Sequence, residues 1–475
     1  MIDEDVRGMF LGLDEEVDYS GGTKAAVNLD SAATTPPLIR VIDEINRLMP
    51  MYGSIGRGTG QKSQSSSKVY TDGRDEVLAF VGADSEKYTV IYTNCTPDGM
   101  NKLASALIGS PRDRVLTTRM EHHANDLPWR ERARTVYVDV DEKGRLKLDD
   151  YERILEKYNY EVELESGEKV RRNEIKYVAV TAASNVTGYV NDVHKIAGIA
   201  HRYGAQIIVD GAQIVAHRAF SMRSNEDCNA DCSEDRDIDF FVFSAHKMYS
   251  PYGGGAIVGL KDVLNARLPV FYGGGIVEKV TDDDVVYSPE PDRYEAGSPN
   301  YAGVVGMLEA MRFLREFGFK RIKEHEQELL RYALDRLEAL NGEYMGQVLL
   351  YGDSADIGDR VGILTFNLKM QENKAVAEYL SWHAAIAVRH AKFCAHTYVD
   401  RLLGHRESDK SDTACVTHEG MVRVSFGLYT VKEDIDALID AVRDMLEGKD
   451  AKPFADAYIA ATTPERAVRL PNDRG

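Results

Sequence analysis

The sequence has no long hydrophobic run and no excess of positive charge. Within its 475 residues, no apolar segment approaches the ~18–20 residues that span a bilayer. Lys and Arg number 58 against 77 Asp and Glu, a formal net charge of −19. A surface this acidic repels nucleic-acid phosphates and anionic lipids. The first 16 residues lack the basic start and apolar stretch of a signal peptide. We therefore expect a cytoplasmic protein without a nucleic-acid or membrane partner.

Cysteine is scarce, and the count is odd. The five cysteines are Cys95, Cys228, Cys232, Cys394 and Cys415. They cannot all pair, and a chain this long has enough core to fold without disulfides. We expect free thiols. Cys228 and Cys232 lie in an acidic insertion (224–237) that lacks the second ligand pair of a tetrahedral metal site, so we interpret it as a solvated loop.

What the sequence does have is a regular alternation of apolar runs and helix-period segments. The runs cover residues 88–93, 114–120, 134–140, 175–184, 205–210 and 238–247. Helical spacing occurs between them, for example over 98–107 and 193–203. This alternation predicts a mostly parallel sheet with helices on both faces and ligands at the carboxyl ends of the strands. We interpret 250–300, rich in Gly, Pro and Asp, as ordered loops.

A second block follows a long helical segment that begins near residue 301. Apolar runs over 361–368, 385–390 and 421–426 alternate there with helical patterns over 373–383 and 431–448, which predicts a smaller α+β domain. The predicted organisation is an acidic N-terminal segment (1–26), a large cofactor-binding domain (27–300), a small C-terminal domain (301–449) and a polar tail (450–475).

Two charged residues stand at the ends of predicted buried strands. Lys247 leaves the run 238–247, where desolvation would lower the pKa of its amine and let it form a Schiff base with a carbonyl. A lone lysine in a loop would ordinarily extend into solvent. Asp210 ends the run 205–210, however, and a buried carboxylate needs a cationic partner such as a pyridinium nitrogen. The pair favours a pyridoxal phosphate site.

A phosphate seat is predicted at the same edge of the sheet. Thr96 suits the N-cap position of a helix, and Pro97 suits the first helical position. The N–H groups at such a helix start bind phosphate readily. Alone, this pattern usually marks only the start of a helix. Its position directly after the run 88–93 favours a phosphate site, because it places the helix start at the same edge of the sheet as Asp210 and Lys247.

Seven motifs in this order carry a resemblance to a known family. They are DSAATTP (30–36), MEHHANDLPW (120–129), SNVTG (184–188), VDGAQ (209–213), FSAHK (243–247), RYEAGSPN (293–300) and VRHAKFCAH (388–396). In them the chain resembles the class V aminotransferase family of fold-type I pyridoxal phosphate enzymes, and is most similar to SUF-type cysteine desulfurases and selenocysteine lyases. The resemblance covers about residues 27–447. It implies an α/β fold, with a seven-stranded, mostly parallel sheet in the large domain and a smaller α+β domain.

The resemblance implies roles around the cofactor, pyridoxal 5'-phosphate. Lys247 would hold it as a Schiff base, and Asp210 would pair with its pyridinium nitrogen. Gln213 would hydrogen-bond its phenolic oxygen. His122 would stack on the ring and move protons.

It also implies how the phosphate and the substrate are bound. Thr96, Ser244 and His246 would bind the phosphate, with Ser298 reaching it from the partner subunit of a homodimer. The residues that would bind the substrate are Asn185, Arg423 and Arg389. Arginine offers a carboxylate the bidentate fork that lysine lacks.

Cys394 is the expected nucleophile. It follows the run 385–390 and has basic neighbours that would favour its thiolate, namely Arg389, His390, Lys392 and His396. In the resembling desulfurases this position carries the nucleophile. The implied reaction converts L-cysteine to L-alanine and leaves the sulfur as a persulfide on Cys394, for delivery to an acceptor protein such as an iron–sulfur cluster scaffold.

The sequence departs from the family pattern at two places near the site. Pro97 replaces the second threonine of the phosphate loop. Of the family's usual segment Arg-Thr-Gly-His-His-Cys, only the first and last residues are present here, as Arg389 and Cys394. The segment lines the mouth of the site in the family, so the difference bears on substrate choice. An insertion at 402–420 is long enough for a lid or an acceptor-docking element, and equally suits a surface loop.

Other functions remain open from the sequence. The same cofactor site would serve a selenocysteine lyase, another C–S lyase, or a class V aminotransferase or epimerase; transfer and epimerisation would not need Cys394. A scaffold or sulfur-relay partner without turnover is a further alternative, against which the complete set of Lys247, Asp210, His122 and Arg423 argues. The sulfur acceptor is not identified by the sequence.

Overall fold

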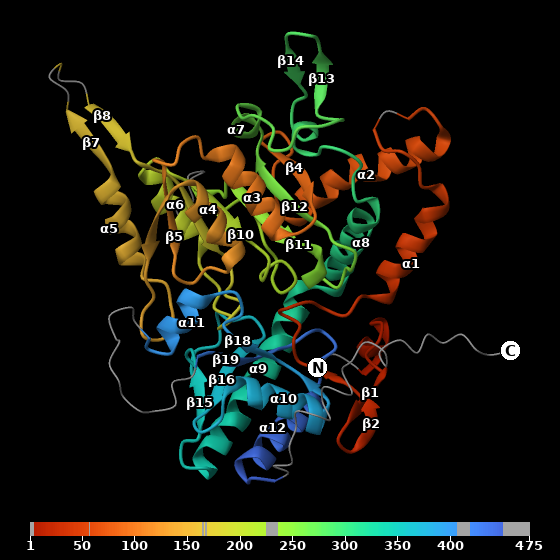
Figure 1. Ribbon diagram of the computed structural model, residues 1–475, viewed down its shortest axis with the longest axis vertical. Coiled ribbons are helices and arrows are strands. Elements are labelled where there is room, and N and C mark those ends of the chain that lie inside the picture. The colour runs from red at the N-terminus through yellow and green to blue at the C-terminus, as the bar shows by residue number, and fades with distance from the viewer. Residues whose placement is uncertain are drawn as a thin grey trace.

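The computed structural model describes residues 4–56, 58–163, 166, 169–224, 236–405 and 419–449. The tail 450–475, Cys228, Cys232, Cys415 and most of the two insertions lie outside these residues. In Figure 1 a large sheet occupies the upper half of the molecule and a small sheet the lower half. None of the described helices has the length and apolar character needed to cross a membrane.

The large sheet has seven strands in the order β4-β12-β11-β10-β9-β5-β6. Their bounds are β4 (Tyr88–Thr93), β5 (Arg114–Thr118), β6 (Arg134–Val138), β9 (Ile175–Thr181), β10 (Gln206–Asp210), β11 (Phe240–Ser244) and β12 (Gly255–Leu260). The pairs among β6, β5, β9, β10 and β11 are parallel, whereas β12 is antiparallel to both of its neighbours. The predicted mostly parallel sheet is therefore confirmed.

Strand β12 corrects one sequence prediction, because it lies within residues 250–300, which the composition predicts to be loops. Its glycines serve close packing. A Cβ at Gly259 would lie 2.6 Å from the Phe240 ring, and one at Gly255 would lie 2.4 Å from the Phe243 carbonyl oxygen. Glycine in a strand can mark such close approach as well as a turn.

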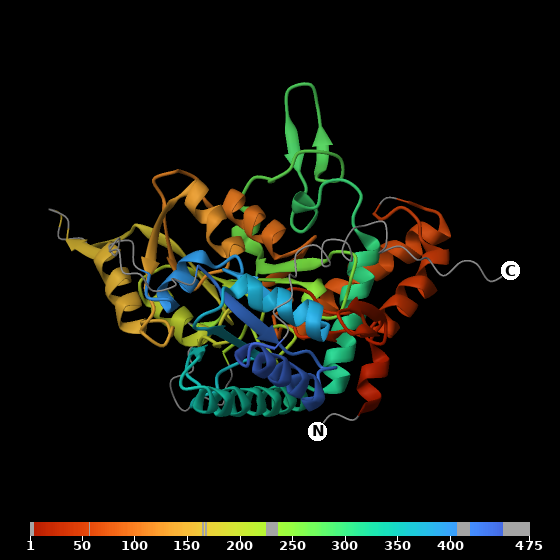
Figure 2. The same cartoon turned by 60° about the horizontal axis from the view of Figure 1, so that its bottom comes forward.

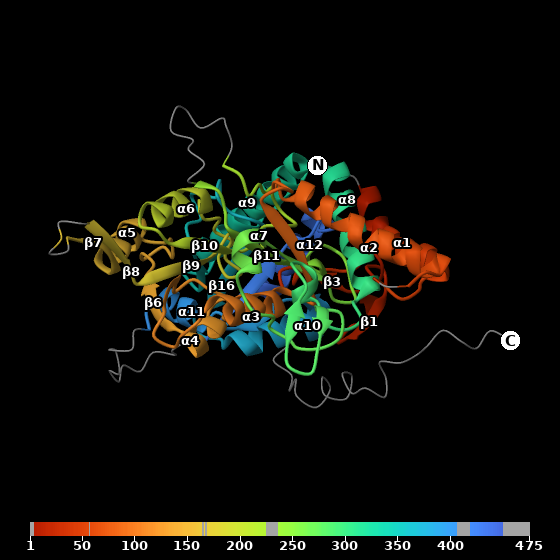
Figure 3. The ribbon, with the colours of Figure 1, turned by 90° about the horizontal axis from the view of Figure 1, so that it is seen from above.

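Helices cover both faces of this sheet. Side chains that alternate along a strand enter different cores: on β5, Val115 packs in the core with α3 and α4, and Leu116 in the core with α5 and α6. Figure 3 shows α3 and α4 on one side of the strands and α6 on the other. The bounds are α3 (Thr96–Leu107), α4 (Leu127–Arg132), α5 (Leu148–Tyr158) and α6 (Val193–Arg202).

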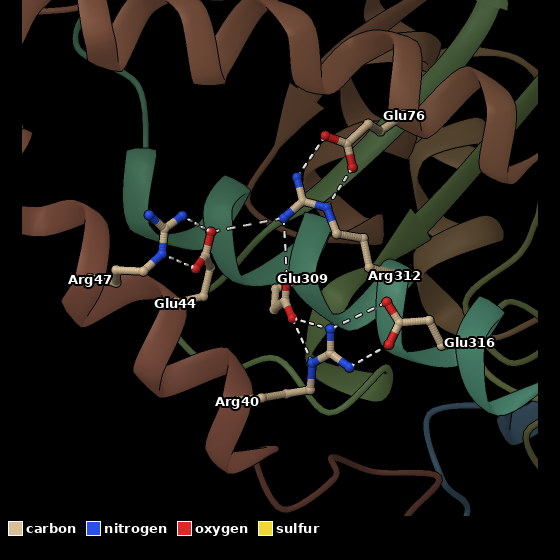
Figure 4. A network of polar contacts seen from close by, with 7 residues as sticks. All are labelled: Arg40, Glu44, Arg47, Glu76, Glu309, Arg312 and Glu316. Carbon is tan, nitrogen blue, oxygen red and sulfur yellow. Dashed lines mark hydrogen bonds and ion pairs between the residues drawn. The ribbon is translucent and has the colours of Figure 1, made fainter.

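Three further helices, α1 (Ile39–Leu48), α2 (Gln61–Phe80) and α8 (Tyr301–Phe317), are joined by ion pairs. Figure 4 shows this network, in which Glu309 of α8 binds both Arg40 and Arg312. Arg312 also binds Glu76 of α2 at 2.6 Å. Arg40 reaches Glu316 at 2.6 Å. Apolar residues of α8 lie in the core of the large sheet, although our sequence division placed this helix with the small domain.

The small sheet is antiparallel, in the order β15-β16-β19-β18. Its strands are β15 (Val348–Tyr351), β16 (Ile363–Leu368), β18 (Arg389–Ala391) and β19 (Met421–Ser425). It packs against α9 (Phe319–Glu343), α10 (Asn373–Ala384) and α12 (Lys432–Leu446). β16, β19 and α12 fall within predicted segments, and β18 and α10 extend one residue beyond theirs, whereas β15 lies where no strand was predicted.

The start of the chain joins this second block. β3 (Val27–Asn28) pairs in parallel with β17 (Ile386–Ala387), and Leu29 lies in the second core. The hairpin of β1 (Glu16–Tyr19) and β2 (Gly22–Ala25) lies beside α10, and the Ser20 N–H donates to the Trp382 carbonyl at 2.8 Å. Residues that begin the predicted large domain therefore contact the small one.

A buried polar cluster also connects the two blocks. Glu326 of α9 lies 2.5 Å from His217 Nδ1 and 2.8 Å from Arg218 Nη1. His217 and Arg218 lie at the end of the turn that follows Asp210. Arg218 also donates to the Arg360 carbonyl oxygen at 2.6 Å. The segment that leaves the cofactor edge is thus anchored to the small block.

The remaining described elements are short hairpins, helices and turns. Two hairpins project from the molecule, and Figure 2 shows the β13–β14 hairpin standing clear of it. The bounds are β7 (Asn159–Glu163), β8 (Lys169–Asn173), α7 (Lys261–Asn265), β13 (Val277–Val280), β14 (Val285–Tyr287) and α11 (His396–Leu402). Short 3-10 turns are η1 (Glu4–Met9), η2 (Met49–Met51), η3 (His123–Asn125), η5 (Ala245–Lys247) and η6 (Asp292–Tyr294).

Candidate active site

A cavity lies where the carboxyl ends of β5, β9, β10 and β11 meet the small sheet. It brings together every predicted site residue except Ser298, namely Thr96, His122, Asn185, Asp210, Gln213, Ser244, His246, Lys247, Arg389, Cys394 and Arg423. Ser298 is exposed and lines a neighbouring pocket with Asn94 and Phe271. Its predicted role across a subunit interface stays a prediction.

Asp210 and Lys247 form the charged pair expected at this edge. Asp210 is the last residue of β10, is 3% exposed, and accepts a hydrogen bond from the Ala212 N–H at 2.9 Å. Burial raises its pKa, against the lowering effects of that bond and of Lys247. Burial lowers the pKa of Lys247 to about 8, although Asp210 acts to raise it. The raised pKa of Asp210 means that Lys247 does not fully compensate for the burial of this carboxylate, so a closer cation would stabilise its charged form further. The lowered pKa of Lys247 means that its amine is readily deprotonated.

His122 is held in one tautomer. Its Nδ1 accepts a hydrogen bond from the Ala124 N–H at 3.0 Å, which leaves the proton of the neutral ring on Nε2. Burial, and then the charge of Lys247, lower its pKa to about 3. The ring is therefore neutral near pH 7 and offers an N–H donor.

The start of α3 differs by one residue from the sequence prediction. The N-cap is Cys95, and Thr96 is already helical, because the Cys95 carbonyl accepts the first helical bond from Gly99 at 3.1 Å. The Thr96 N–H donates to Ser244 Oγ at 2.6 Å, and the two hydroxyl oxygens lie 2.8 Å apart. Thr96, Pro97 and Ser244 all line the cavity, so the helix start faces it despite the missing threonine.

Two residues that line this cavity carry buried polar atoms without a hydrogen-bond partner. These atoms are Gln213 Oε1 and Arg423 Nε. Gln213 is anchored by its Nε2, which donates to the Ala32 carbonyl at 2.9 Å. Unpaired buried polar atoms are costly, and here both belong to residues that line a cavity with a buried carboxylate and a helix start. The residues present fit a phosphorylated cation such as pyridoxal phosphate.

Arg423 reaches the cavity from β19 and is 3% exposed. Its Nη1 donates to the Asn185 carbonyl at 3.0 Å, and its Nη2 donates to Asp30 Oδ1 at 2.9 Å. Burial lowers its pKa, against the raising effect of Asp30. The sequence interpretation placed Arg423 and Asn185 together, and they are in contact.

The loop that carries Cys394 is held from several sides. Asn185 Nδ2 donates to the Phe393 carbonyl at 2.8 Å, and the His123 N–H donates to the Cys394 carbonyl at 2.7 Å. The Phe393 ring lies 5.2 Å from the Arg423 guanidinium carbon. Both Phe393 and Cys394 have left-handed φ angles, 48° and 53°, which non-glycine residues rarely adopt. These contacts hold an exposed thiol at the cavity wall.

The basic neighbours predicted for Cys394 are partly neutralised by acids. Lys392 binds Asp400 at 2.8 Å, and Arg389 lies 3.7 Å from Asp30. His396 packs edge-on against His123, with 4.6 Å between ring centroids. The neighbourhood is therefore mixed rather than simply positive.

Sequence reasoning gave no role to two acidic residues next to this site. Asp30 lies in the quoted motif 30–36 but was given no role, although its carboxylate contacts both arginines. Glu121 is 2% exposed and accepts hydrogen bonds from Thr118 Oγ1 and Asn125 Nδ2, each at 2.6 Å. Burial raises its pKa to about 8. The sequence does contain a clue to Glu121, because this acidic residue directly precedes His122.

Comparisons with known proteins agree with this geometry. The sequence profile of the class-V aminotransferase family matches residues 27–438. The chain belongs to the class V aminotransferase family. It is 32% identical over 435 residues to a cysteine desulfurase of Haloferax volcanii, covering 90% of each chain. It is 33% identical to a probable cysteine desulfurase of Halalkalibacterium halodurans, covering 91% of this chain and 95% of that one.

Solved structures of cysteine desulfurases have the same fold. The apo enzyme of Thermococcus onnurineus superposes with a TM-score of 0.76 at 26% identity, covering 94% of this chain and 99% of that one. Class V aminotransferases and cysteine desulfurases depend on pyridoxal phosphate. The predicted α/β fold and family are thereby confirmed.

Proposed function

We propose that this protein is a pyridoxal phosphate-dependent cysteine desulfurase that converts L-cysteine to L-alanine and takes the sulfur onto Cys394. The observation that carries the proposal is that the exposed thiol of Cys394 lines the same cavity as Lys247, Asp210 and Arg423. An aminotransferase would need the last three residues but not the thiol. The similarity to cysteine desulfurases supports the same proposed activity.

The residues suited to hold the cofactor divide into three groups. Lys247 would bind its aldehyde carbon, and Asp210 its ring nitrogen, with His122 against the ring and Gln213 beside the phenolic oxygen. The phosphate would lie at the start of α3, with Thr96, Ser244 and His246 around it. When bound, the cofactor supplies a carbonyl for the substrate amine and a ring that accepts the electron pair left by the α-proton.

The protein's own groups would carry out the rest. Arg423 and Asn185 orient the α-carboxylate, Arg389 binds the substrate at the mouth of the cavity, and the free amine of Lys247 moves the α-proton. The Cys394 thiolate attacks the sulfur of L-cysteine, so that an S–S bond forms while the substrate C–S bond breaks. The bond electrons pass to the carbon side, and protons complete L-alanine. One sulfur atom leaves the substrate and stays on Cys394 as a persulfide.

The homodimer and the sulfur acceptor belong to the same proposal. Ser298 is exposed and lies beside Phe271, whose side chain is 56% exposed, and Tyr272 is 68% exposed. Exposed aromatic residues near a predicted phosphate ligand support an interface there. Light scattering after gel filtration would show a dimer, and Phe271→Asp would give a monomer. The acceptor would take the persulfide sulfur, and a cytoplasmic location is proposed with it.

The proposal is tested by measuring L-alanine and sulfide from L-cysteine with pyridoxal phosphate and reductant. Wild type should give equal amounts of both. Cys394→Ala should abolish them, with Lys247→Ala as the blank and Cys415→Ala as a thiol control that retains activity. Without reductant, Cys394 should gain the mass of one sulfur atom. Alanine formed by Cys394→Ala would indicate a lyase, and no alanine from wild type would reject the proposal.

A further inference from the structure

Two arginines of the site stand directly opposite each other on neighbouring strands. Arg389 of β18 is paired in register with Arg423 of β19 in an antiparallel ladder. Like charges in such a position repel and destabilise a sheet. The repulsion is greater because Arg423 is almost fully buried. The pair therefore requires an anion.

Asp30 supplies that anion. Its Oδ1 accepts from Arg423 Nη2 at 2.9 Å, and its Oδ2 lies 3.7 Å from Arg389 Nη1. The aspartate is fixed by its own backbone, since its N–H donates to Asn28 Oδ1 at 3.0 Å and the residue bridges to Ser425 of β19. One carboxylate thus spans both guanidinium groups from a rigid position.

Both terminal nitrogens of Arg423 already have a polar partner. Nη1 already donates to the Asn185 carbonyl, and Nη2 donates to Asp30. Nε is buried, with almost no accessible surface, and has no hydrogen-bond partner. Each of the two terminal nitrogens carries a second N–H, so a carboxylate can still bind Arg423, but it shares the positive charge of the guanidinium with Asp30.

We propose that Asp30 is the resident counter-ion of Arg389 and Arg423, and that the substrate α-carboxylate competes with it for them. This deepens the proposed function and rests on its assignment of Arg423 to the α-carboxylate. Asp30 neutralises the two arginines when no substrate is bound. It also lowers the affinity of the site for any carboxylate, including that of the product L-alanine. It is a residue that sets affinity rather than a catalytic residue.

The test measures the binding of propionate, which has the carboxylate of alanine but no amine to react with the cofactor. Isothermal titration of the cofactor-loaded protein, in a buffer free of carboxylates and low in chloride, gives the Kd. Asp30→Asn should bind propionate about tenfold more tightly than wild type, because the competing charge is gone. Asp30→Glu keeps the charge and should stay near wild type.

A matched control separates competition from loss of an ion pair. Asp434 binds Arg7 at 2.8 Å, does not line the cavity, and has a side chain that is 10% exposed, against 19% for Asp30. Asp434→Asn should lower the melting temperature without changing the Kd for propionate. If Asp30→Asn binds propionate no more tightly than wild type, the competition is wrong and Asp30 is only structural.

A second variant keeps the test decisive if Asp30→Asn does not fold. Asp30→Ser also removes the competing charge, with a smaller side chain, and it should likewise bind propionate more tightly than wild type. An unchanged Kd would overturn the proposal. The outcome is separate from the desulfurase assay: wild type that forms no alanine rejects the proposed function, whereas the propionate Kd values bear only on Asp30.

Discussion

The side-chain amide of Asn185 donates a hydrogen bond to the backbone carbonyl of Phe393, the residue before Cys394. The carbonyl of Asn185 itself accepts from Arg423. One residue therefore fixes both the loop of the nucleophile and the arginine expected to bind the substrate.

Replacing Asn185 by alanine should reduce kcat/KM for alanine formation about tenfold, the effect of losing one hydrogen bond of about 1.5 kcal/mol. Steady-state kinetics with L-cysteine measure this. Asn367→Ala is the matched control, because its amide donates to the Gly420 carbonyl at 2.9 Å in the small sheet. It should lower stability but leave kcat/KM unchanged. Equal losses in both variants would contradict a local role.

Lys247 should capture the cofactor at a pH where ordinary lysines are still protonated. Only the neutral amine attacks an aldehyde, and burial lowers the Lys247 pKa to about 8 from 10.5. On mixing cofactor-free protein with pyridoxal phosphate, the initial rate of absorbance change should rise with pH and level off above about 8. A rate that kept rising to pH 10 would contradict this, and Lys247→Ala should show no such change.

His122 should contribute to catalysis as a neutral ring. Because its pKa is lowered to about 3, it should produce no inflection in the pH profile of kcat/KM between pH 5 and 7. His122→Ala should reduce kcat about 100-fold while cofactor binding, followed by absorbance, persists. His194→Ala on α6 serves as control and should retain activity. A His122-dependent inflection near pH 6.5 would show that the ring is charged.

The Glu326 cluster should stabilise the protein above acidic pH. Burial raises the pKa of Glu326, but the charges and hydrogen bonds of His217 and Arg218 lower it below 4.5 overall. Its stabilising contribution is therefore complete above 4.5 and is lost as pH falls through the folded-state value. Glu326→Gln should cost about 3 kcal/mol of unfolding free energy at pH 7, measured with urea.

A surface carboxylate provides the comparison for Glu326. Glu316 binds Arg40 at 2.6 Å, but its side chain is 62% exposed. Glu316→Gln should cost less than about 1 kcal/mol, because exposed ion pairs contribute little. Equal losses for the two variants would show that burial of Glu326 is unimportant.

Much of the fold and most of the site could be predicted because the signals are local. The strand 88–93 was predicted at its observed limits, since β4 is a continuous buried apolar run. Asp210 and Lys247 could be placed together because parallel strands end at one edge of a sheet.

What could not be predicted depends on register and packing. β12 could not be recognised as a strand, because its segment is rich in glycines of the kind that usually mark turns. The contact of Asp30 with Arg389 and Arg423 requires the pairing of β18 with β19, which no local pattern specifies. The left-handed backbone at Cys394 likewise follows from contacts made by distant residues, such as Asn185 and His123.

The pairing of Val27 with Ile386 has a consequence for synthesis at the ribosome. Residues 27–30 leave the exit tunnel early, but their partner strand is translated only after most of the chain has emerged. The large sheet can form meanwhile, since its strands end at residue 260. Asp30 is synthesised long before Arg389 and Arg423, so it cannot pair with them until the chain is nearly complete. A nascent chain can therefore form the cofactor edge of the large sheet before it forms the substrate pocket.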